Sequence, residues 1–97
     1  MIEFEWDSAK ARTNLRKHGV SFREAATVFK DPLSITISDP DHSDEEDRCI
    51  TIGASARARI LMVSHTDRGG RIRIISTREL THTERHAYEE EIQRRKG

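Results

Sequence analysis

The sequence predicts an α+β fold, with a small antiparallel sheet of about five strands, a pair of helices near the N-terminus and one helix at the C-terminus. The sheet is indicated by four runs of alternating apolar residues, joined by short connections, between residues 33 and 78. Two capping signals that flank a glycine between residues 7 and 31 indicate the helix pair. A polar segment after residue 81, which opens with a further capping signal, indicates the last helix. At 97 residues the chain is expected to form one domain, 1–97.

The N-terminal third of the chain predicts a strand followed by a helical hairpin. Residues 2–6 alternate strictly between apolar and acidic side chains, which is typical of a short strand. A helix is expected to begin at Asp7 or Ser8, which can cap it, and to end at Gly19, which can adopt a left-handed conformation. Residues 21–24 have the serine-to-glutamate spacing of a capping box and predict a second, short helix that ends before a proline.

The rest of the chain predicts a meander of strands and a final helix. The four expected strands are residues 33–38, 48–53, 59–66 and 71–78. The acidic run 39–47 is too charged to be buried and is expected to form a solvated loop or turn. The sequence Asp-Arg-Gly-Gly at residues 67–70 predicts a tight hairpin between the last two strands. Residues 81–96 are expected to form a helix with few apolar residues.

Charge is unevenly distributed, although the net charge of the chain is zero. Six acidic residues and no basic residue lie between positions 39 and 47. Six arginines and a single acid lie between positions 57 and 78, and a basic segment of this kind attracts phosphate groups. Cys49 stands alone and excludes an intrachain disulfide. Because no segment has the pattern of a signal peptide or a membrane span, we expect a cytoplasmic protein that does not contact a membrane.

The strand at 71–78 is the strongest candidate for a phosphate-binding element. Arg71 and Arg73 alternate with isoleucines, so one face can join a core while the other presents two guanidinium groups. Arg78 lies at the end of this strand and could turn back toward the same site. The pair Ile74-Ile75 breaks the alternation and predicts either a bulge or a strand buried on both faces. A simpler interpretation is an edge strand that its charges keep soluble.

Two histidines could transfer protons near these arginines. His65 ends the preceding strand and could lie across from Arg73 or Arg71, and His18 ends the first helix beside Lys17. A histidine that moves protons, together with cations that stabilise a phosphate, suits RNA cleavage without a metal, in which the ribose 2′-hydroxyl attacks the neighbouring phosphorus. The catalytic candidates are Arg73, Arg78, His65, Lys17 and His18, and which of them acts as the general base stays open.

Three further residues are candidates for substrate binding. Arg59 is expected to share a strand face with His65, Arg71 belongs to the arginine strand, and Tyr88 could stack on a base or simply pack on the sheet. His82 and His86 have the spacing of two metal ligands on one helix face, but no third ligand is indicated. We therefore expect no metal site and no cofactor.

Two blocks of the sequence resemble the signatures of the BrnT toxin family. The first block comprises Phe4-Glu5-Trp6-Asp7, Lys10, Asn14-Leu15, residues 17–22, Ala25 and residues 29–32. The second comprises residues 73–78, followed by Glu84-Arg85 and Tyr88. The chain departs from the family pattern at Thr77, where an alanine is usual, and at Asp47, where a glutamate usually precedes the arginine of the third strand.

The resemblance implies a RelE-like ribonuclease toxin of a bacterial type II toxin–antitoxin pair, with a compact antiparallel sheet flanked by helices. It also implies a small ribbon-helix-helix antitoxin that covers the toxin and binds operator DNA. Toxin and antitoxin are expected to form a 2:2 complex. The alternative is a non-catalytic module that uses the same basic face to bind nucleic acid or the acidic segment of a partner. Both hypotheses use Arg71, Arg73 and Arg78, so binding data alone do not separate them, whereas a cleavage assay or a neighbouring antitoxin gene does.

Overall fold

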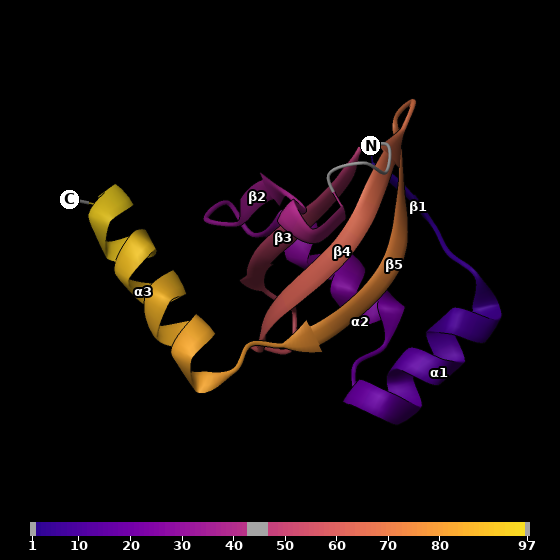
Figure 1. Cartoon of the computed structure of the whole chain (residues 1–97), viewed down its shortest axis with the longest axis horizontal. Coiled ribbons are helices and arrows are strands. Elements are labelled where there is room, and N and C mark those ends of the chain that lie inside the picture. The colour runs from indigo at the N-terminus through magenta and orange to yellow at the C-terminus, as the bar shows by residue number, and fades with distance from the viewer. Residues whose placement is uncertain (1, 43–46, 97) are drawn as a thin grey trace.

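The computed structural model of the protein describes residues 2–42 and 47–96. Its helices and strands are β1 (Glu3–Glu5), α1 (Ser8–His18), α2 (Phe22–Thr27), the 3-10 helix η1 (Val28–Lys30), β2 (Ile35–Ser38), the 3-10 helix η2 (Pro40–His42), β3 (Arg48–Ala54), β4 (Ile60–Arg68), β5 (Arg71–Glu79) and α3 (His82–Lys96). Residues 43–46 of the acidic run, for which a loop was predicted, lie outside the described residues. The predicted α+β class, the helix pair and the last helix are confirmed (Figure 1).

The five strands form one sheet in the order β1-β5-β4-β3-β2. Strands β2 to β5 pair as the predicted antiparallel meander. Strand β1, however, runs parallel to β5, so the sheet is mixed and the prediction of a purely antiparallel sheet is wrong for this strand. No tight turn joins β1 to its neighbour, because both helices and three strands intervene in the chain. The local sequence of β1 therefore carries no signal for its direction.

Helices α1 and α2 cover one face of the sheet, and the core lies between these helices and the strands. Its fully buried side chains are Val20, Phe22, Ala25, Val28, Leu61, Val63 and Ile74. Phe4 of β1 packs against Phe29 of η1 with ring centroids 5.3 Å apart, and Trp6 meets the edge of Phe22. Leu15 of α1 is 51% exposed, because α1 contacts β5 through Asn14.

The opposite face of the sheet carries a second set of apolar residues. Pairing places Ile35 beside Ile52 and Ile37 beside Ile50, with Met62 next to Ile52 on β4. These side chains alternate with the residues that face the helices, and none of them belongs to the core. The half of this face that lies along β5 is polar and carries arginines. The structure thus separates the apolar residues into a fully buried set beneath the helices and a partly buried set on the opposite face.

The β4–β5 hairpin has the predicted turn and the predicted bulge. Gly69 and Gly70 form the two-residue loop, and both have positive φ, 55° and 91°, as a tight hairpin turn requires. Farther along, Ser64 pairs with Ser76 while His65 pairs with Ile74, so Ile75 is the extra residue of a β-bulge. Of the two alternatives predicted for the broken alternation at Ile74-Ile75, the structure therefore has the bulge and not a strand buried on both faces. The bulge also returns Thr77 to the covered face, where it is buried.

Helix α3 projects away from the sheet, as Figure 1 shows. None of its described residues is buried. Its less exposed positions, Glu84, Tyr88, Glu91 and Ile92, share one side of the helix. No helix in the described ranges is long and apolar enough to cross a membrane.

Candidate functional site

Two arginines of β5 are paired with carboxylates of the neighbouring strand. Because β1 runs parallel beside β5, Glu3 lies next to Arg71 and Glu5 next to Arg73. Arg71 Nε lies 3.1 Å from a Glu3 carboxylate oxygen, and Arg73 Nη1 lies 3.2 Å from Glu5 Oε2. Arg71 is also 3.7 Å from Glu5. Arg71 and Arg73, which the sequence analysis predicted to bind an external phosphate, are therefore partly neutralised by carboxylates of the protein itself.

Arg78, near the end of β5, is held by Glu84 in the first turn of α3. Its Nη1 and Nη2 donate to the two carboxylate oxygens at 2.8 and 3.0 Å. Glu84 also accepts a hydrogen bond from the backbone N–H of Thr81 at 2.9 Å, which completes a capping box. The Arg78 guanidinium lowers the pKa of Glu84 to about 2. Arg73 and Arg78 share a sheet face, but they lie about 15 Å apart along the strand and are held by carboxylates of different elements.

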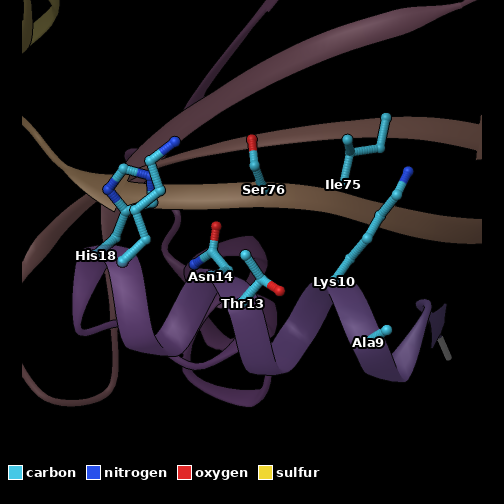
Figure 2. A pocket seen from close by; sticks show the side chains of 8 residues that line it. Ala9, Lys10, Thr13, Asn14, His18, Ile75 and Ser76 are labelled. Carbon is cyan, nitrogen blue, oxygen red and sulfur yellow. The ribbon is translucent and has the colours of Figure 1, made fainter.

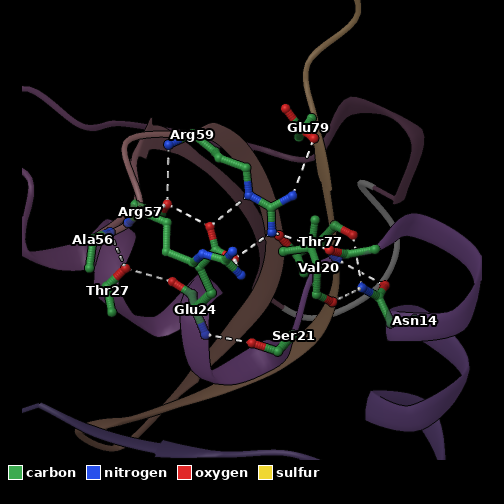
Figure 3. Close-up of polar contacts among 12 residues, drawn as sticks. Asn14, Val20, Ser21, Glu24, Thr27, Ala56, Arg57, Arg59, Thr77 and Glu79 are labelled. Atoms are coloured by element: carbon green, nitrogen blue, oxygen red, sulfur yellow. Dashed lines mark hydrogen bonds and ion pairs between the residues drawn. The ribbon is translucent and has the colours of Figure 1, made fainter.

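Arg59 is part of a buried ionic cluster that joins three segments of the chain (Figure 3). Its guanidinium donates to both oxygens of Glu24, whose side chain is buried, and to the backbone carbonyl of Gly19 at 3.1 Å. Glu24 also accepts a hydrogen bond from Ser55 Oγ at 2.7 Å, and Glu79 lies 3.3 Å from Arg59. Arg59 lowers the pKa of Glu24 below its ordinary value. These hydrogen bonds use N–H groups of Arg59 that the sequence analysis expected to bind substrate.

His65 is buried among the core residues rather than exposed beside the arginines. The bulge places it across from Ile74, not across from Arg73 or Arg71 as the sequence suggested. Its Nε2 lies 2.7 Å from Thr51 Oγ1, and its ring meets the edge of Phe29 at 4.9 Å between centroids. Burial lowers the pKa of His65 below 6.5. An imidazole that is 4% exposed does not reach the open face, so this geometry gives no support to a role in proton transfer.

A groove of about 330 Å³ lies between α1 and β5, and we name it the α1–β5 groove. Its lining consists of Ala9, Lys10, Thr13, Asn14, Lys17, His18, Ile75 and Ser76. Figure 2 shows Lys10 and His18 toward its two ends, with Ser76 and Ile75 on the strand beside α1. Ser76 points to the same side of β5 as Arg78, because Thr77 between them is buried on the covered side. The groove therefore opens toward the face that carries the arginines.

Asn14 holds the two walls of the groove together. Its Nδ2 donates to the carbonyl of Thr77 at 2.9 Å, and its Oδ1 accepts the Thr77 N–H at 3.1 Å (Figure 3). The same Nδ2 donates to the carbonyl of Val20 at 3.0 Å. The amide thus replaces a neighbouring strand at the edge of β5, beyond the point where β1 ends. This clamp fixes the position of Ser76 and Arg78 relative to α1.

The groove holds cations that form no close ion pair with a carboxylate of the described residues. Helix α1 contains four lysines or arginines, one histidine and no acid. Within the described part of the chain, no ion pair involves Lys10, Lys17 or His18. Of the catalytic candidates, Lys17 and His18 line the groove, whereas Arg73, Arg78 and His65 are not part of its lining. Sequence reasoning missed Lys10 and Ser76 as members of the groove, although a helix without a single acid was a visible signal.

The remaining candidates lie away from the groove. Tyr88 is half-buried on the inner side of α3, where burial, with a smaller effect of nearby Asp31, raises its pKa. His82 and His86 are exposed on α3, and His86 Nδ1 lies 3.0 Å from Glu90. In residues 2–42 and 47–96, no group of three or more His, Cys, Asp or Glu side chains is arranged to hold a metal ion.

The comparisons with known proteins agree with the fold and with the resemblance. The sequence profile of the family described as "Ribonuclease toxin, BrnT, of type II toxin-antitoxin system" matches residues 6–84. The 1.1 Å crystal structure of the Brucella abortus ribonuclease toxin BrnT is similar in fold, with a TM-score of 0.66 and 23% sequence identity. The match covers 84% of this chain and 99% of that chain. No match was found among curated protein sequences. Because the family profile spans most of its length, the chain belongs to the BrnT family of ribonuclease toxins of type II toxin–antitoxin systems.

Proposed function

We propose that this chain is an endoribonuclease that cleaves RNA without a metal ion, at the His18 end of the α1–β5 groove. The proposal depends on one observation: Lys17 and His18 line the same groove as Ser76 of β5. Neither Lys17 nor His18 forms an ion pair in the described part of the chain. Arg78 follows Ser76 by two residues on the same strand face, about 7 Å along the strand. Two cations, a proton carrier and a hydroxyl thus lie within reach of one phosphodiester.

The proposed reaction is an internal transfer within the RNA. The ribose 2′-oxygen attacks the adjacent phosphorus, and the 2′-O–P bond forms as the P–O5′ bond breaks. One base takes the 2′-hydroxyl proton and one acid returns a proton to the leaving 5′-oxygen, which yields a 2′,3′-cyclic phosphate and a 5′-hydroxyl. We assign proton transfer to His18, and stabilisation of the developing phosphate charge to Lys17 and Arg78. Glu84 orients Arg78 through two of its donors and leaves Nε for the phosphate.

Arg73 and Arg71 fit a supporting role in this proposal. They lie farther along the same strand, and their side chains are 36% and 61% exposed despite the pairs with β1. We propose that they contact RNA phosphates outside the cleaved bond. His65 and Arg59 stabilise the fold in this scheme, and Tyr88 takes no part in the reaction.

We further propose that the chain acts in the cytoplasm and is neutralised by a ribbon-helix-helix antitoxin in a 2:2 complex that binds operator DNA. Membership of a type II toxin–antitoxin family supports a protein antitoxin. Co-expression of the chain with the product of the neighbouring gene tests this part. The expected result is rescue of growth, together with a complex whose mass corresponds to two copies of each chain.

The enzyme proposal is tested with purified protein and a mixed-sequence RNA in the presence of EDTA. We expect cleavage by the wild type and a loss of about 100-fold or more for His18→Ala, since general acid–base catalysis contributes on that order. Lys17→Ala and Arg78→Ala are expected to lower kcat by about 100-fold each. Arg16→Ala is the matched control, because this exposed arginine lies on α1 outside the groove lining.

The outcomes separate the proposal from its alternative. Cleavage that EDTA abolishes would overturn the metal-independent mechanism. RNA binding with no cleavage by the wild type would favour a binding module. Equal activity of the wild type and His18→Ala would remove this histidine from the reaction.

A further inference from the structure

The α1–β5 groove is longer than cleavage of one phosphodiester requires. Lys10 and Lys17 are seven positions apart on α1, which places them about 10 Å apart along the helix axis. Both line the groove, and Thr13 lies between them on the same side of the helix. The proposed reaction uses only the end that contains Lys17 and His18. The part of the groove near Lys10 is therefore not used by the proposed reaction.

The Lys10 end has the charge to bind an anion. The ammonium of Lys10 has no ion-pair partner among the residues that the structure describes. The nearest acid in the sequence, Asp7, uses a carboxylate oxygen to accept the backbone N–H of Lys10 at 2.9 Å and caps α1. An anion at Lys10 displaces no carboxylate, whereas an anion at Arg73 or Arg78 competes with Glu5 or Glu84.

The strand wall of the groove offers an apolar surface beside this charge. Ile75 is the extra residue of the bulge in β5, so its side chain is not committed to the regular alternation of the strand. It lines the groove opposite α1, with Ser76 next to it (Figure 2). A cation, two hydroxyls and one aliphatic side chain together match the parts of a nucleotide, namely its phosphate, its sugar hydroxyls and the apolar face of its sugar or base.

We propose that the Lys10 end of the α1–β5 groove is a subsite for the nucleotide that adjoins the cleaved dinucleotide, with its phosphate at Lys10 and Thr13 and its sugar or base against Ile75. The ligand class is single-stranded RNA. This inference rests on the proposed function, because it takes the His18 end as the place of cleavage. It states that the enzyme reads at least one nucleotide beyond the dinucleotide that it cuts.

The test compares short RNA substrates of known sequence. The substrates are a dinucleotide and two trinucleotides, extended by one nucleotide on the 5′ or on the 3′ side. We expect one trinucleotide to have a kcat/KM about fivefold above that of the dinucleotide, the size of one exposed charge contact, with most of the gain in KM. In Lys10→Ala the ratio of trinucleotide to dinucleotide is expected to fall close to one. The backbone N–H of residue 10 is kept in this variant, so the cap of α1 is kept as well.

Two controls make the result specific. Arg16→Ala removes the same charge from the same helix outside the groove and is expected to keep the wild-type ratio. A binding measurement does not depend on cleavage: it uses 2′-O-methyl trinucleotides, which cannot undergo the internal attack. Lys10→Ala is expected to weaken binding of the preferred trinucleotide and to reduce the slope of log K against log salt concentration by about 0.7, the value for one phosphate contact with a single strand.

The outcomes distinguish failure of the subsite from failure of the enzyme proposal. Cleavage with equal ratios in the wild type and Lys10→Ala would overturn the subsite and leave the ribonuclease intact. Equal loss in Arg16→Ala and Lys10→Ala would show a diffuse charge effect and would also overturn it. If no RNA is cleaved, the proposed function fails, and a change in the salt slope that is confined to Lys10→Ala would still support the subsite as a phosphate-binding site.

Discussion

Thr77 is a buried residue of β5 whose hydroxyl has no hydrogen-bond partner among the described residues. It stands where BrnT toxins usually have a small alanine, and the two-hydrogen-bond clamp from Asn14 uses only its backbone. A buried hydroxyl without a partner is unfavourable compared with an apolar group of the same shape. The departure from the family pattern is therefore expected to cost stability rather than to serve the site.

Thr77→Val is expected to raise the free energy of unfolding by about 1 kcal/mol, because it removes the unsatisfied hydroxyl and keeps the volume and the strand preference. Urea unfolding measures the change. Thr51→Val is the matched control: the Thr51 hydroxyl lies 2.7 Å from Thr36 Oγ1 and 2.7 Å from His65 Nε2, so its loss is expected to destabilise the protein. A destabilised Thr77→Val variant would contradict the prediction.

His65 makes the stability of the fold depend on pH. Burial lowers its pKa below 6.5 in the folded protein, so at mildly acidic pH the unfolded chain binds more protons than the folded one. The contribution of neutral His65 to the free energy of unfolding is complete above about pH 6.5, the ordinary histidine pKa. This contribution is lost as the pH falls below that value. Unfolding measured between pH 7.5 and 5 is expected to show this decline in the wild type and a weaker one in His65→Gln. His86→Gln, which changes an exposed histidine of α3, is expected to behave as the wild type does.

At the scale of elements, the contact between α1 and β5 depends on one amide. Beyond β1, the edge of β5 has no partner strand, and Asn14 supplies both a donor and an acceptor to Thr77. Asn14→Ala is expected to lower the free energy of unfolding by about 2–3 kcal/mol, since it leaves buried backbone groups unsatisfied. It is also expected to speed amide exchange at Thr77. Arg12→Ala, an exposed change on the same helix, serves as the control. Unchanged exchange at Thr77 would contradict the role of the clamp.

The ion pair of Arg78 with Glu84 connects β5 to the start of α3. Since Arg78 lowers the pKa of Glu84 from 4.5 to about 2, the pair stabilises the fold above pH 4.5, and this contribution is lost as the pH falls toward 2. Glu84→Gln is expected to remove this part of the acid dependence and to keep the helix cap, because glutamine can accept the same Thr81 N–H. The acid dependence of stability is measured by unfolding the protein at falling pH and monitoring the circular dichroism signal. Glu89→Gln is the control, because the pair of Glu89 with Arg85 is exposed and longer, at 3.6 Å.

On the scale of the whole molecule, the folded chain redistributes the charge that the sequence displays. Five arginines of the arginine-rich segment (57, 59, 71, 73 and 78) form ion pairs, whereas the cations without a pair in the described chain include Lys10, Lys17 and His18 of α1. Only pairing in three dimensions produces this reversal, because β1 carries Glu3 and Glu5 to the arginines from the other end of the chain. The open face of the sheet therefore presents arginines that are partly neutralised, beside a groove whose cations are not.

Most of the fold could be predicted from local patterns in the sequence. Alternation, capping boxes and the Gly-Gly turn are short-range effects, and they located the strands of the meander, the helix pair and the β4–β5 hairpin close to their observed limits. Family membership was also visible in the sequence, because its signature residues form contiguous blocks. Lys17 and His18 were named as catalytic candidates because they are neighbours at the end of a predicted helix, and their catalytic role stays a prediction.

Tertiary structure alone decided the direction of β1, the burial of His65 and the use of Arg59 for the Glu24 cluster. Each of these depends on which segments meet, and a contact between distant segments leaves no trace in a local pattern. The bulge at Ile75 shows the reason most clearly. One extra residue changes which side chains face the core, and its effect on His65, Thr77 and Arg78 depends on the register with β4, which the sequence of β5 does not contain.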